Sequence, residues 1–600
     1  MKAHTRLRAA LWIAAAVFST HLQAVEAVHP PAAEAAHALH ELVETHFERT
    51  LELAPLFATA IGDSRYDDRL GNPASTLERV RFENLQREAL RAARALPRAA
   101  LSPADRLTLD IFIEDCERTL AAMRFPSHLM PITQLNSVAI DLAVLGSGEG
   151  QQPLATTAQH EAWLKRAAEF PAWVDAAIAN MRLGVARGVT LPRRAAEKVL
   201  PQLRVIANTP LDKSVFRGAI ARLPQDLSTL DRNRLVAAYE KLIGDELLPA
   251  YRRLADYFEH EYLPRCRASD GWSGLPDGAA WYRERIGANT GLDLSAEQIH
   301  RIGLAEVARI RDEMDRVRQE AGFAGDLKAF FAHVASDPRF YARTPEEIVE
   351  RFVAIKRRVD PQLPQLFSRM PVADYEVRPI EAFRANAAPG AFYQAPSADG
   401  KRPGVFYINT HDLRAVPIWG METLSLHEAS PGHHFQMSLA QEITDLPRFR
   451  RFRDDNAYAE GWALYAETLG RDLGLFSDPY QRFGKLNDEM LRASRLVVDT
   501  GLHAMGWSRE RAIAYMQHNQ VMSDGDAVIE VERYMADPGQ ALGYKLGQLR
   551  ILALRRAAEQ RLGTAFDVRA FHREVLVDGA LPIPVLEQKL REWIARTANP

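Results

Sequence analysis

The stretch that decides the chemistry of this 600-residue chain is His427-Glu428-Ala429-Ser430-Pro431-Gly432-His433-His434. It places imidazoles and a carboxylate within eight residues. Neutral imidazole and carboxylate groups are the ligands that suit a catalytic zinc ion with an open coordination position. A glutamate directly after the first histidine is placed to act as a general base beside such a metal. We therefore expect a zinc-dependent hydrolase of the peptidase class.

The spacing of these histidines does not fit a regular helix. Six residues turn a helix by about 600°, which takes His433 off the face of His427. Seven residues restore the face for His434 but separate the rings by about 10 Å along the axis. Pro431 and Gly432 supply a break, because proline interrupts the hydrogen-bond ladder and glycine accepts unusual dihedral angles. We expect a kink there to bring His433 back toward His427, with His434 as the alternative ligand or as a group that supports a ligand or contacts substrate.

A second acidic segment, Glu460-Gly461-Trp462-Ala463-Leu464-Tyr465-Ala466-Glu467, follows about thirty residues later. Its two glutamates are seven residues apart and therefore share one face of a helix. The residues before the first motif, 416–426, are rich in apolar side chains and could lead into a buried helix. Together these features favour a metal site over the alternative, a helix–turn–helix with incidental histidines.

Length and capping patterns predict a mainly α, large two-lobed helical fold. Six hundred residues exceed what one hydrophobic core usually holds. The turn-forming segment 271–278 is a candidate boundary, so we expect an N-terminal helical lobe over residues 28–275 and a C-terminal lobe with the zinc site over 276–600. Residues 295–321 have the apolar spacing of an amphipathic helix. Helix N-caps are predicted at Ser102, Ser295 and Thr344.

Composition excludes several other classes of function. Apolar residues make up 47% and charged residues 26% of the chain, which is ordinary for a globular protein. The net charge of −3 comes from mixed acidic and basic residues, so we expect no nucleic-acid partner. A Gly-x-Ser-x-Gly elbow is absent from the sequence, which argues against a serine hydrolase. Cys116 and Cys266 could form one disulfide, but we expect incidental thiols, because neither belongs to a metal or redox motif.

The first residues have the pattern of a secretory signal peptide. An apolar run over residues 9–18 is followed by small residues, and cleavage after Ala24 or Ala27 fits the pattern. The run is too short for a typical membrane span, so we expect no stable membrane anchor after cleavage. We therefore predict a signal peptide over residues 1–27 and a periplasmic or secreted mature protein. The basic residues that precede the run are Lys2, Arg6 and Arg8.

A short non-helical region precedes the histidine motif. Residues 391–393 and 405–409 contain aromatic and β-branched side chains and are separated by turn formers, which predicts a β-hairpin beside the zinc helix. An exposed edge strand can hold an extended peptide by main-chain pairing, and Asn409 is the side chain that we expect to contact it. The alternative is a structural hairpin that only buries Phe406 and Ile408.

These motifs resemble the bacterial family known as domain of unknown function 885, as a branch of the thermolysin-like zinc peptidases. The resemblance covers most of the mature chain as one family domain and is strongest over residues 380–550. By analogy with helical oligopeptidases, it implies one Zn²⁺ per chain, with Glu460 as the third ligand and Glu467 as a group that supports a ligand. The residues that carry the resemblance are the two motifs above, residues 399–410, Glu532-Arg533-Tyr534 and residues 538–547.

The resemblance also suggests groups that act on the substrate. Tyr544 lies where helical zinc peptidases keep a tyrosine that stabilises negative charge on the attacked carbonyl, although an ordinary helix tyrosine is the alternative. Tyr534 is the second choice, and Arg533 could bind a substrate carboxylate or pair with an acid. A helical set with spacings of three, four and four could be a carboxylate clamp or a buried ion-pair network. That set is Arg492, Arg495, Asp499 and His503.

We therefore expect a peptidase of the carboxypeptidase or oligopeptidase type, with Glu428 as the general base for a zinc-activated water. A peptide or amide is the expected partner. One alternative is a metal-dependent amidase that acts on cell-wall peptides or small amides. Another is a non-catalytic binding protein on a peptidase fold, although an intact Glu428 argues against it, because a structural metal site has no need of a base.

Overall fold

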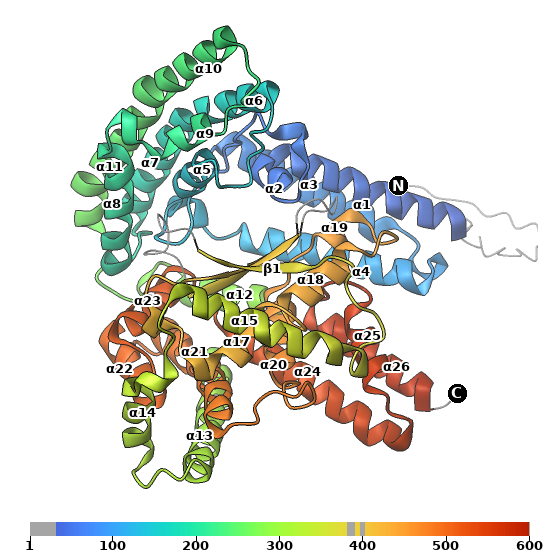
Figure 1. The fold of residues 1–600 in the computed structure, drawn as a ribbon. Coiled ribbons are helices and arrows are strands. Elements are labelled where there is room, and N and C mark those ends of the chain that lie inside the picture. The colour runs from blue at the N-terminus through green and yellow to red at the C-terminus, as the bar shows by residue number, and fades with distance from the viewer. Residues whose placement is uncertain (1–31, 381–389, 397–402, 599–600) are drawn as a thin grey trace, which may run out of the picture.

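A computed structural model of the chain describes residues 32–380, 390–396 and 403–598. The fold is mainly helical with one small sheet, as the sequence predicted (Figure 1). The predicted signal peptide, residues 1–27, lies outside the described residues, as does part of the motif at 399–410. No helix in the described ranges combines the length and the apolar character that crossing a membrane requires.

The N-terminal helices form the blue and green part of Figure 1. Helices α5 to α11 share one buried apolar core, which includes Trp163, Trp173 and Tyr251, and α1, α3 and α4 pack around a separate one. A π-helical turn, Leu242–Leu247, joins the last two helices. The helices are α1 Ala32–Leu53, α2 Pro55–Ala60, α3 Thr76–Ala95, α4 Pro103–Ala122, α5 Val138–Gly146, α6 Thr157–Ala168, α7 Phe170–Arg187, α8 Arg193–Asn208, α9 Gly218–Ala221, α10 Thr229–Lys241 and α11 Leu248–Tyr257.

The C-terminal helices build a second part around two further cores. The larger core surrounds Trp462 and Phe435, and the other packs α13 against α21. The helices are α12 Gly278–Thr290, α13 Ala296–Glu320, α14 Leu327–Ser336, α15 Pro345–Val359, α17 Met421–Glu428, α18 His433–Gln441, α19 Arg448–Arg451, α20 Asn456–Glu467, α21 Pro479–Ala504, α22 Arg509–Asn519, α23 Asp524–Ala536, α24 Leu542–Leu562, α25 Val568–Leu576 and α26 Ile583–Ala598.

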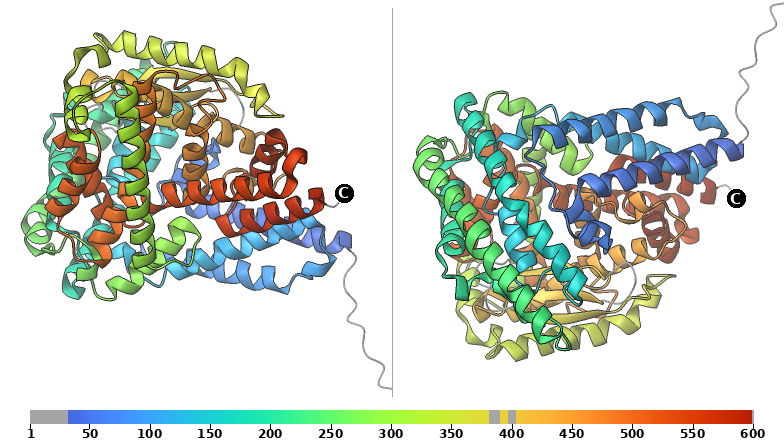
Figure 2. Two further views of the ribbon diagram at one scale, coloured as in Figure 1. Left: turned by 90° about the horizontal axis from the view of Figure 1, so that it is seen from below. Right: turned by 90° about the horizontal axis from the view of Figure 1, so that it is seen from above.

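The first helices of the chain also contact the C-terminal part. The Phe112 ring of α4 lies 5.4 Å from the Phe449 ring of α19, measured between centroids. Figure 2 shows the arrangement of the two parts from two further directions. The division predicted between residues 275 and 276 stays a prediction. Cys116 and Cys266 are free, buried and in different cores, so the structure contains no disulfide between them.

Several helices begin where the capping patterns predicted. The Ser102 side chain accepts a hydrogen bond from the Asp105 amide, and Thr344 caps α15 in the same way. Ser295 and Gln298 form a reciprocal capping box at the start of α13. The observed bounds of α13 agree with the predicted helix over 295–321. These contacts occupy amide groups that a helix N-terminus cannot pair internally.

The small sheet has the strand order β1-β3-β2, with β1 Tyr375–Pro379, β2 Ala391–Gln394 and β3 Gly404–Ile408. The predicted hairpin is the antiparallel pair β2–β3, in which Phe392 lies opposite Tyr407. Strand β1 pairs in parallel with β3 and was not predicted, because its alternation of charged residues resembles a solvated segment. The middle strand β3 is buried throughout. Of the two outer strands, β2 is the one that contacts α17 and α18, which carry the histidine motif.

Helices α20 and α24 cross with their backbones in contact at two glycines. A Cβ at position 547 would lie 1.9 Å from the Ala457 carbonyl oxygen and 2.8 Å from the Gly461 Cα. A Cβ at position 461 would lie 2.6 Å from the Gly547 backbone. Only glycine fits either position at this separation. The crossing matters because α20 carries the second acidic segment and α24 carries Tyr544.

We predict that Gly547→Ala destabilises the protein because the added methyl group meets backbone atoms that cannot move aside. Overpacking of this kind costs about 1–3 kcal/mol in the free energy of unfolding. The control is Gly287→Ala in the interior of α12, where a Cβ would meet nothing within 4 Å. That change should stabilise the helix by roughly 0.5–1 kcal/mol. Denaturant unfolding of both variants tests this, and a Gly547→Ala midpoint no lower than that of Gly287→Ala would contradict the close crossing.

Candidate metal centre

The histidine motif is broken into two helices, as the sequence predicted. Helix α17 ends before the 429–432 turn, α18 begins after it, and the peptide before Pro431 is cis. A Cβ at position 432 would lie 1.9 Å from the His427 carbonyl oxygen, so Gly432 lets the chain fold back onto the end of α17. The Trp462 indole N–H donates to the Pro431 carbonyl at 2.8 Å. Helix α20 therefore holds the turn in place.

This break brings His433 to His427. The two ring centroids lie 4.8 Å apart and the rings are nearly perpendicular. The Glu460 Oε2 atom lies 3.5 Å from the Nε2 atom of each histidine. One ligand-type atom from each of the three residues can be chosen so that all lie within 4.8 Å of one another. The structure thus assembles the three predicted ligands from α17, α18 and α20.

The second glutamate of α20 contacts the far side of the first imidazole. The Glu467 Oε1 atom lies 2.8 Å from His427 Nδ1, and both side chains are buried. A carboxylate only accepts hydrogen bonds, so this contact places the imidazole proton on Nδ1. The Nε2 atom of His427 is thereby directed toward Glu460, and the ring has the orientation that a metal-ligating histidine adopts.

The electrostatics of this cluster call for a positive charge. Burial lowers the pKa of His427, but Glu460 and Glu467 outweigh it and raise the pKa to about 10. Burial raises the pKa of Glu460, but His433 and His427 outweigh it and hold the pKa well below its usual value. The Glu460 and Glu467 carboxylates lie on the two sides of the His427 ring. Their negative charge would compensate the positive charge of a cation bound at this site.

The donor set fits a zinc ion. The buried Glu460 Oε2 atom lacks a hydrogen-bond donor among the described residues, although both Nε2 atoms face it. Ligand atoms about 2.1 Å from a tetrahedral zinc ion lie about 3.4 Å from each other. The observed separations of 3.5 Å from Oε2 to His427 and His433 are close to that value. The three residues could therefore hold a metal with a small local adjustment.

His434 lies away from this cluster. Its Nδ1 atom is 2.8 Å from the Tyr393 hydroxyl and 3.3 Å from the Ser438 hydroxyl. Burial and the nearby Lys356 ammonium lower the pKa of His434 to about 4, so the ring is neutral near pH 7. Of the two candidates for the second ligand, the geometry favours His433, while His434 joins α18 to the edge strand β2.

Glu428 lies next to the first ligand and is only half-buried. Its charge is among those that raise the pKa of His427, which places the carboxylate near the imidazole. No hydrogen bond or ion pair with another described residue engages it. Because no described residue forms a hydrogen bond or ion pair with its oxygens, the Glu428 carboxylate is available to exchange a proton with a bound molecule.

Tyr544 of α24 also lies beside the cluster, within a group of arginines. Burial and the Glu460 carboxylate raise the pKa of Tyr544, so its phenol stays protonated near pH 7. Arg533 donates to the Tyr544 hydroxyl at 3.2 Å. The guanidinium carbons of Arg495 and Arg492 lie 4.4 and 5.4 Å from the centre of the Tyr544 ring. The structure thus gathers three of the predicted substrate-site residues around one phenol.

Other predicted site residues support the scaffold. The buried Tyr534 hydroxyl donates to Glu530 at 2.6 Å and accepts from Arg495 at 3.1 Å. Tyr534 therefore helps to hold the Arg495 side chain in place. Asn409 follows β3, and its side-chain oxygen accepts a hydrogen bond from the amide of His411. The roles of Tyr534 and Asn409 in substrate binding stay predictions.

The predicted helical set on α21 divides into two halves. Arg492 and Arg495 face Tyr544, whereas Asp499 and His503 hold neighbouring backbone. The Asp499 carboxylate accepts from the Gly539 amide at 3.1 and 3.2 Å. The His503 ring contacts the Trp272 amide at 3.1 Å and the Tyr534 carbonyl at 3.0 Å. Asp499 and His503 therefore belong to a structural network, while the carboxylate clamp of Arg492 and Arg495 stays a prediction.

Two acidic residues near the centre escaped the sequence prediction. Burial and the neighbouring Glu467 raise the pKa of Asp488, one turn before Arg492 on α21, to about 7. Asp454 precedes α20 and is exposed at the surface. Partial desolvation by the surrounding chain, followed by the charges of Asp455 and Glu460, raises its pKa. Asp488 shares the helical spacing of the arginine set and could have been added to it. Asp454 has no such signal.

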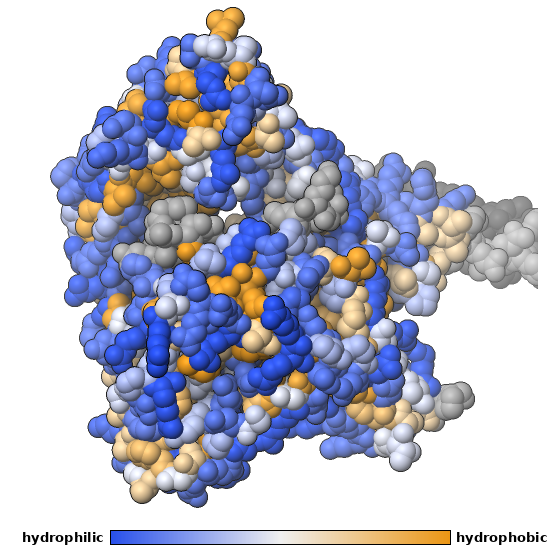
Figure 3. Space-filling model, in the orientation of Figure 1, coloured by the Kyte–Doolittle hydropathy of each residue, from blue (hydrophilic) through white to orange (hydrophobic). Residues whose placement is uncertain are grey.

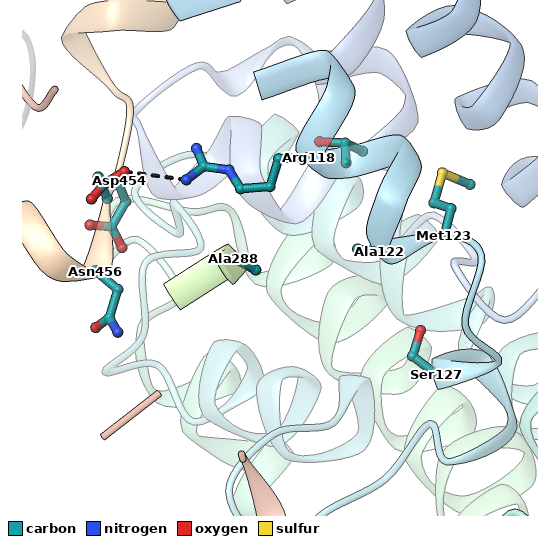
Figure 4. A pocket seen from close by; sticks show the side chains of 9 residues that line it. Arg118, Ala122, Met123, Ser127, Ala288, Asp454 and Asn456 are labelled. Atoms are coloured by element: carbon teal, nitrogen blue, oxygen red, sulfur yellow. Dashed lines mark hydrogen bonds and ion pairs between the residues drawn. The ribbon is translucent and has the colours of Figure 1, made fainter. Parts of the chain in front are cut away.

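A cavity of about 390 Å³ lies between the N-terminal part and the start of α20 (Figure 4). The charges of Glu460 and His433 affect the pKa of the Asp454 carboxyl group in the cavity wall. The cavity therefore lies near the candidate metal site. Figure 4 shows Arg118 of α4 directed toward the Asp454 segment, where it pairs with Asp455 at 3.3 Å. The lining residues are Arg118, Thr119, Ala122, Met123, Ser127, Ala288, Asp454, Asp455 and Asn456.

Comparisons with known proteins agree with this architecture. A crystal structure of a protein from Colwellia psychrerythraea, provisionally described as a lipoprotein, matches with a TM-score of 0.88 and 28% identity over 94% of this chain and 99% of that chain. A Shewanella oneidensis protein, provisionally described as a lipoprotein of unknown function, shares the fold, with a TM-score of 0.69 and 18% identity over 92% of this chain and 99% of its own.

The sequence family covers nearly the same region. A comparison with curated proteins gives no match. The family described as "Bacterial protein of unknown function (DUF885)" matches residues 55–590. This span includes the histidine motif, the second acidic segment and the arginine cluster. Because it takes in well over half of the chain, the protein belongs to the DUF885 family.

Proposed function

We propose that this protein is a zinc-dependent peptidase in which His427, His433 and Glu460 hold one zinc ion. The observation that carries the proposal is the convergence of these three ligand-type atoms from three helices. Glu467 supports it, because a carboxylate on the remote imidazole nitrogen is a common feature of zinc sites. A structural zinc site usually closes its fourth position with another protein ligand, whereas a catalytic site leaves that position for water or substrate.

A zinc ion in such a site lowers the pKa of a water molecule to about 7 and polarises a carbonyl group. The protein side chains supply the proton transfers. The half-buried Glu428 carboxylate has no hydrogen bond or ion pair with another residue in the described ranges. It can accept a proton from the attacking water and then pass it to the leaving amine. The protonated Tyr544 hydroxyl is a hydrogen-bond donor for the oxygen that gains negative charge.

The surroundings of the cluster can hold an extended chain. The edge strand β2 contacts both metal-binding helices and is half-buried along its length. Main-chain pairing along such an edge is a general way to bind a peptide. The cavity beside Asp454 offers space on another side of the cluster. These features favour a peptide as the substrate.

We also propose that the protein is exported. The two similar structures belong to proteins provisionally described as lipoproteins, a class that is carried out of the cytoplasm. The basic and apolar pattern of the first residues supports the same location. Detection of the mature protein in a periplasmic or culture fraction tests this part of the proposal.

Replacing each neighbouring histidine separates the ligand from its neighbour. We predict that His433→Ala removes stoichiometric zinc, because it deletes one of three ligands. His434→Ala should retain zinc, because this ring bonds to Tyr393 and Ser438. Metal analysis of the purified variants after zinc loading tests the assignment. Loss of zinc from His434→Ala with retention in His433→Ala would reverse it.

Glu467→Gln should weaken zinc binding without abolishing it. Loss of the carboxylate removes the partner that orients His427, and comparable changes cost roughly 10- to 100-fold in metal affinity. The matched control is Glu422→Gln. Glu422 is also buried but lies on α17, and its carboxylate accepts a hydrogen bond from the Phe476 amide at 2.7 Å instead of contacting His427. Competition with a zinc chelator measures both affinities. Equal affinities in the two variants would argue against the orienting role.

Glu428→Gln should bind zinc like the wild type and lose hydrolysis, because glutamine has the shape of glutamate but cannot take a proton. General-base catalysis typically contributes 10²- to 10⁴-fold, so we expect kcat to fall by about that factor. Peptide cleavage followed by mass spectrometry, beside a metal assay of the same samples, measures both quantities. Unchanged turnover would remove Glu428 from the mechanism.

A further inference from the structure

The arginine cluster around Tyr544 is short of negative charge. Arg492, Arg495 and Arg533 all contact the Tyr544 side chain. The ion pairs of the cluster join Glu530 to Arg495 at 2.8 Å and to Arg533 at 3.8 Å, and leave Arg492 out within the described part of the chain. Three guanidinium groups therefore share one ion-paired carboxylate. Asp488, one turn before Arg492, interacts with Arg492 and Arg495 through its charge but forms no ion pair with either of them.

Two N–H groups of the cluster are also left without an acceptor. The Arg492 Nε and Arg495 Nη1 atoms are buried and have no hydrogen-bond partner among the described residues. The Arg495 side chain is only 3% exposed. A buried donor without an acceptor is costly and uncommon, so a group that accepts from these atoms would stabilise the cluster.

A neighbouring cation shows how this protein treats a purely structural charge. Lys545 follows Tyr544 on α24 and is fully buried. Its ammonium pairs with Glu489 at 2.8 Å and Glu306 at 3.0 Å, and donates to Gln548 at 2.8 Å. All three donors of Lys545 thus have partners, in contrast to Arg492. Buried N–H groups without an acceptor also occur on Arg267, Arg450 and Arg482, but around Tyr544 two arginines with such groups contact the same side chain.

The missing partner is a planar anion close to the metal centre. The Tyr544 side chain contacts the arginines, and the negative charge of Glu460 contributes to the raised pKa of its phenol. Guanidinium groups match the geometry of carboxylates and bind them through paired hydrogen bonds. In a peptide, a carboxylate within a few residues of the cleaved bond is either the terminal α-carboxylate or an acidic side chain.

We propose that Arg492, with Arg495 and Arg533, binds the terminal α-carboxylate of a peptide, so that the enzyme removes residues from the carboxyl end. This inference rests on the proposed peptidase function. Arg533 is more exposed than Arg495 and also bonds to Gln540, which links it to Asn456 in the wall of the cavity. Arg495 is held by Glu530 and Tyr534 and serves as the fixed base of the clamp.

The test uses zinc-loaded full-length protein and three synthetic hexapeptides with free amino ends. The first lacks Asp and Glu and has a free carboxyl end, the second is its carboxyl-terminal amide, and the third is an amide with one Glu near that end. We expect cleavage of the first at a kcat/KM at least about tenfold above both amides, since charged hydrogen bonds of this kind give roughly 10- to 100-fold.

Arg492→Gln should reduce kcat/KM for the free acid by roughly 10- to 100-fold, mainly through KM, and leave the amides unchanged. Arg492 makes no protein hydrogen bond in the described structure, so this change removes no structural contact of that kind. Arg533→Gln gives a second reading if the first variant is poorly soluble. The matched control is Arg555→Gln, which removes an arginine of α24 that lies over the ring of another tyrosine, Tyr465 of α20, and donates to its hydroxyl.

The outcomes are distinct. Equal cleavage of acid and amide would overturn the carboxylate clamp and leave the peptidase function standing. Efficient cleavage of the Glu-containing amide, lost in Arg492→Gln, would assign the arginines to an acidic side chain and overturn the terminal assignment. If no peptide is cleaved, the peptidase function fails. Calorimetric titration with the first two peptides then decides the clamp, which requires that the acid bind more tightly and that Arg492→Gln remove the difference.

Discussion

The contact of helix α20 with the broken α17–α18 segment is the constraint on which the site depends. Helix α20 supplies Glu460 to both imidazoles and Glu467 to the remote nitrogen of His427. Its Trp462 holds the turn that lets the two histidines approach. The three residues lie within eight positions of one helix, so a single rigid element fixes the spacing of the candidate ligands, the orientation of the imidazole and the path of the turn.

The same helix also sets the position of the groups that would act on a substrate. Helix α24 crosses α20 with backbones in contact at glycine, and Tyr544 lies at the start of α24. The arginines that surround Tyr544 come from α21 and α23. Negative charge is therefore concentrated around the imidazoles and positive charge around the phenol. This separation suits a reaction in which a cation is held on one side and an anion develops on the other.

Local sequence predicted the features that depend on neighbouring residues. The break at Pro431-Gly432, the N-caps at Ser102 and Ser295 and the β2–β3 hairpin all follow from backbone preferences that act within a few positions. The spacing of Glu460 and Glu467 placed both on one helix face, and the family resemblance implied that Glu467 supports a ligand; its contact with His427 came from the structure.

The remaining features depend on tertiary packing and left no local pattern. Strand β1 was missed because only its parallel pairing with β3 shows that it belongs to the sheet. The cavity beside Asp454 joins residues from α4, α12 and the start of α20, which are far apart in the sequence. Spacing alone placed Arg492 and Asp499 in one set, although they contact different neighbours. Only the packed helices show that the buried Nε atom of Arg492 has no hydrogen-bond acceptor among the described residues.

The most direct test of the account is a crystal structure of the protein grown with zinc, with data collected on both sides of the zinc absorption edge. The account predicts one strong anomalous peak, about 2.0–2.2 Å from the Nε2 atoms of His427 and His433 and from a Glu460 oxygen. Glu467 should remain bonded to His427 Nδ1. A fully loaded crystal with no peak at this position, or with the zinc held by other residues, would contradict the account.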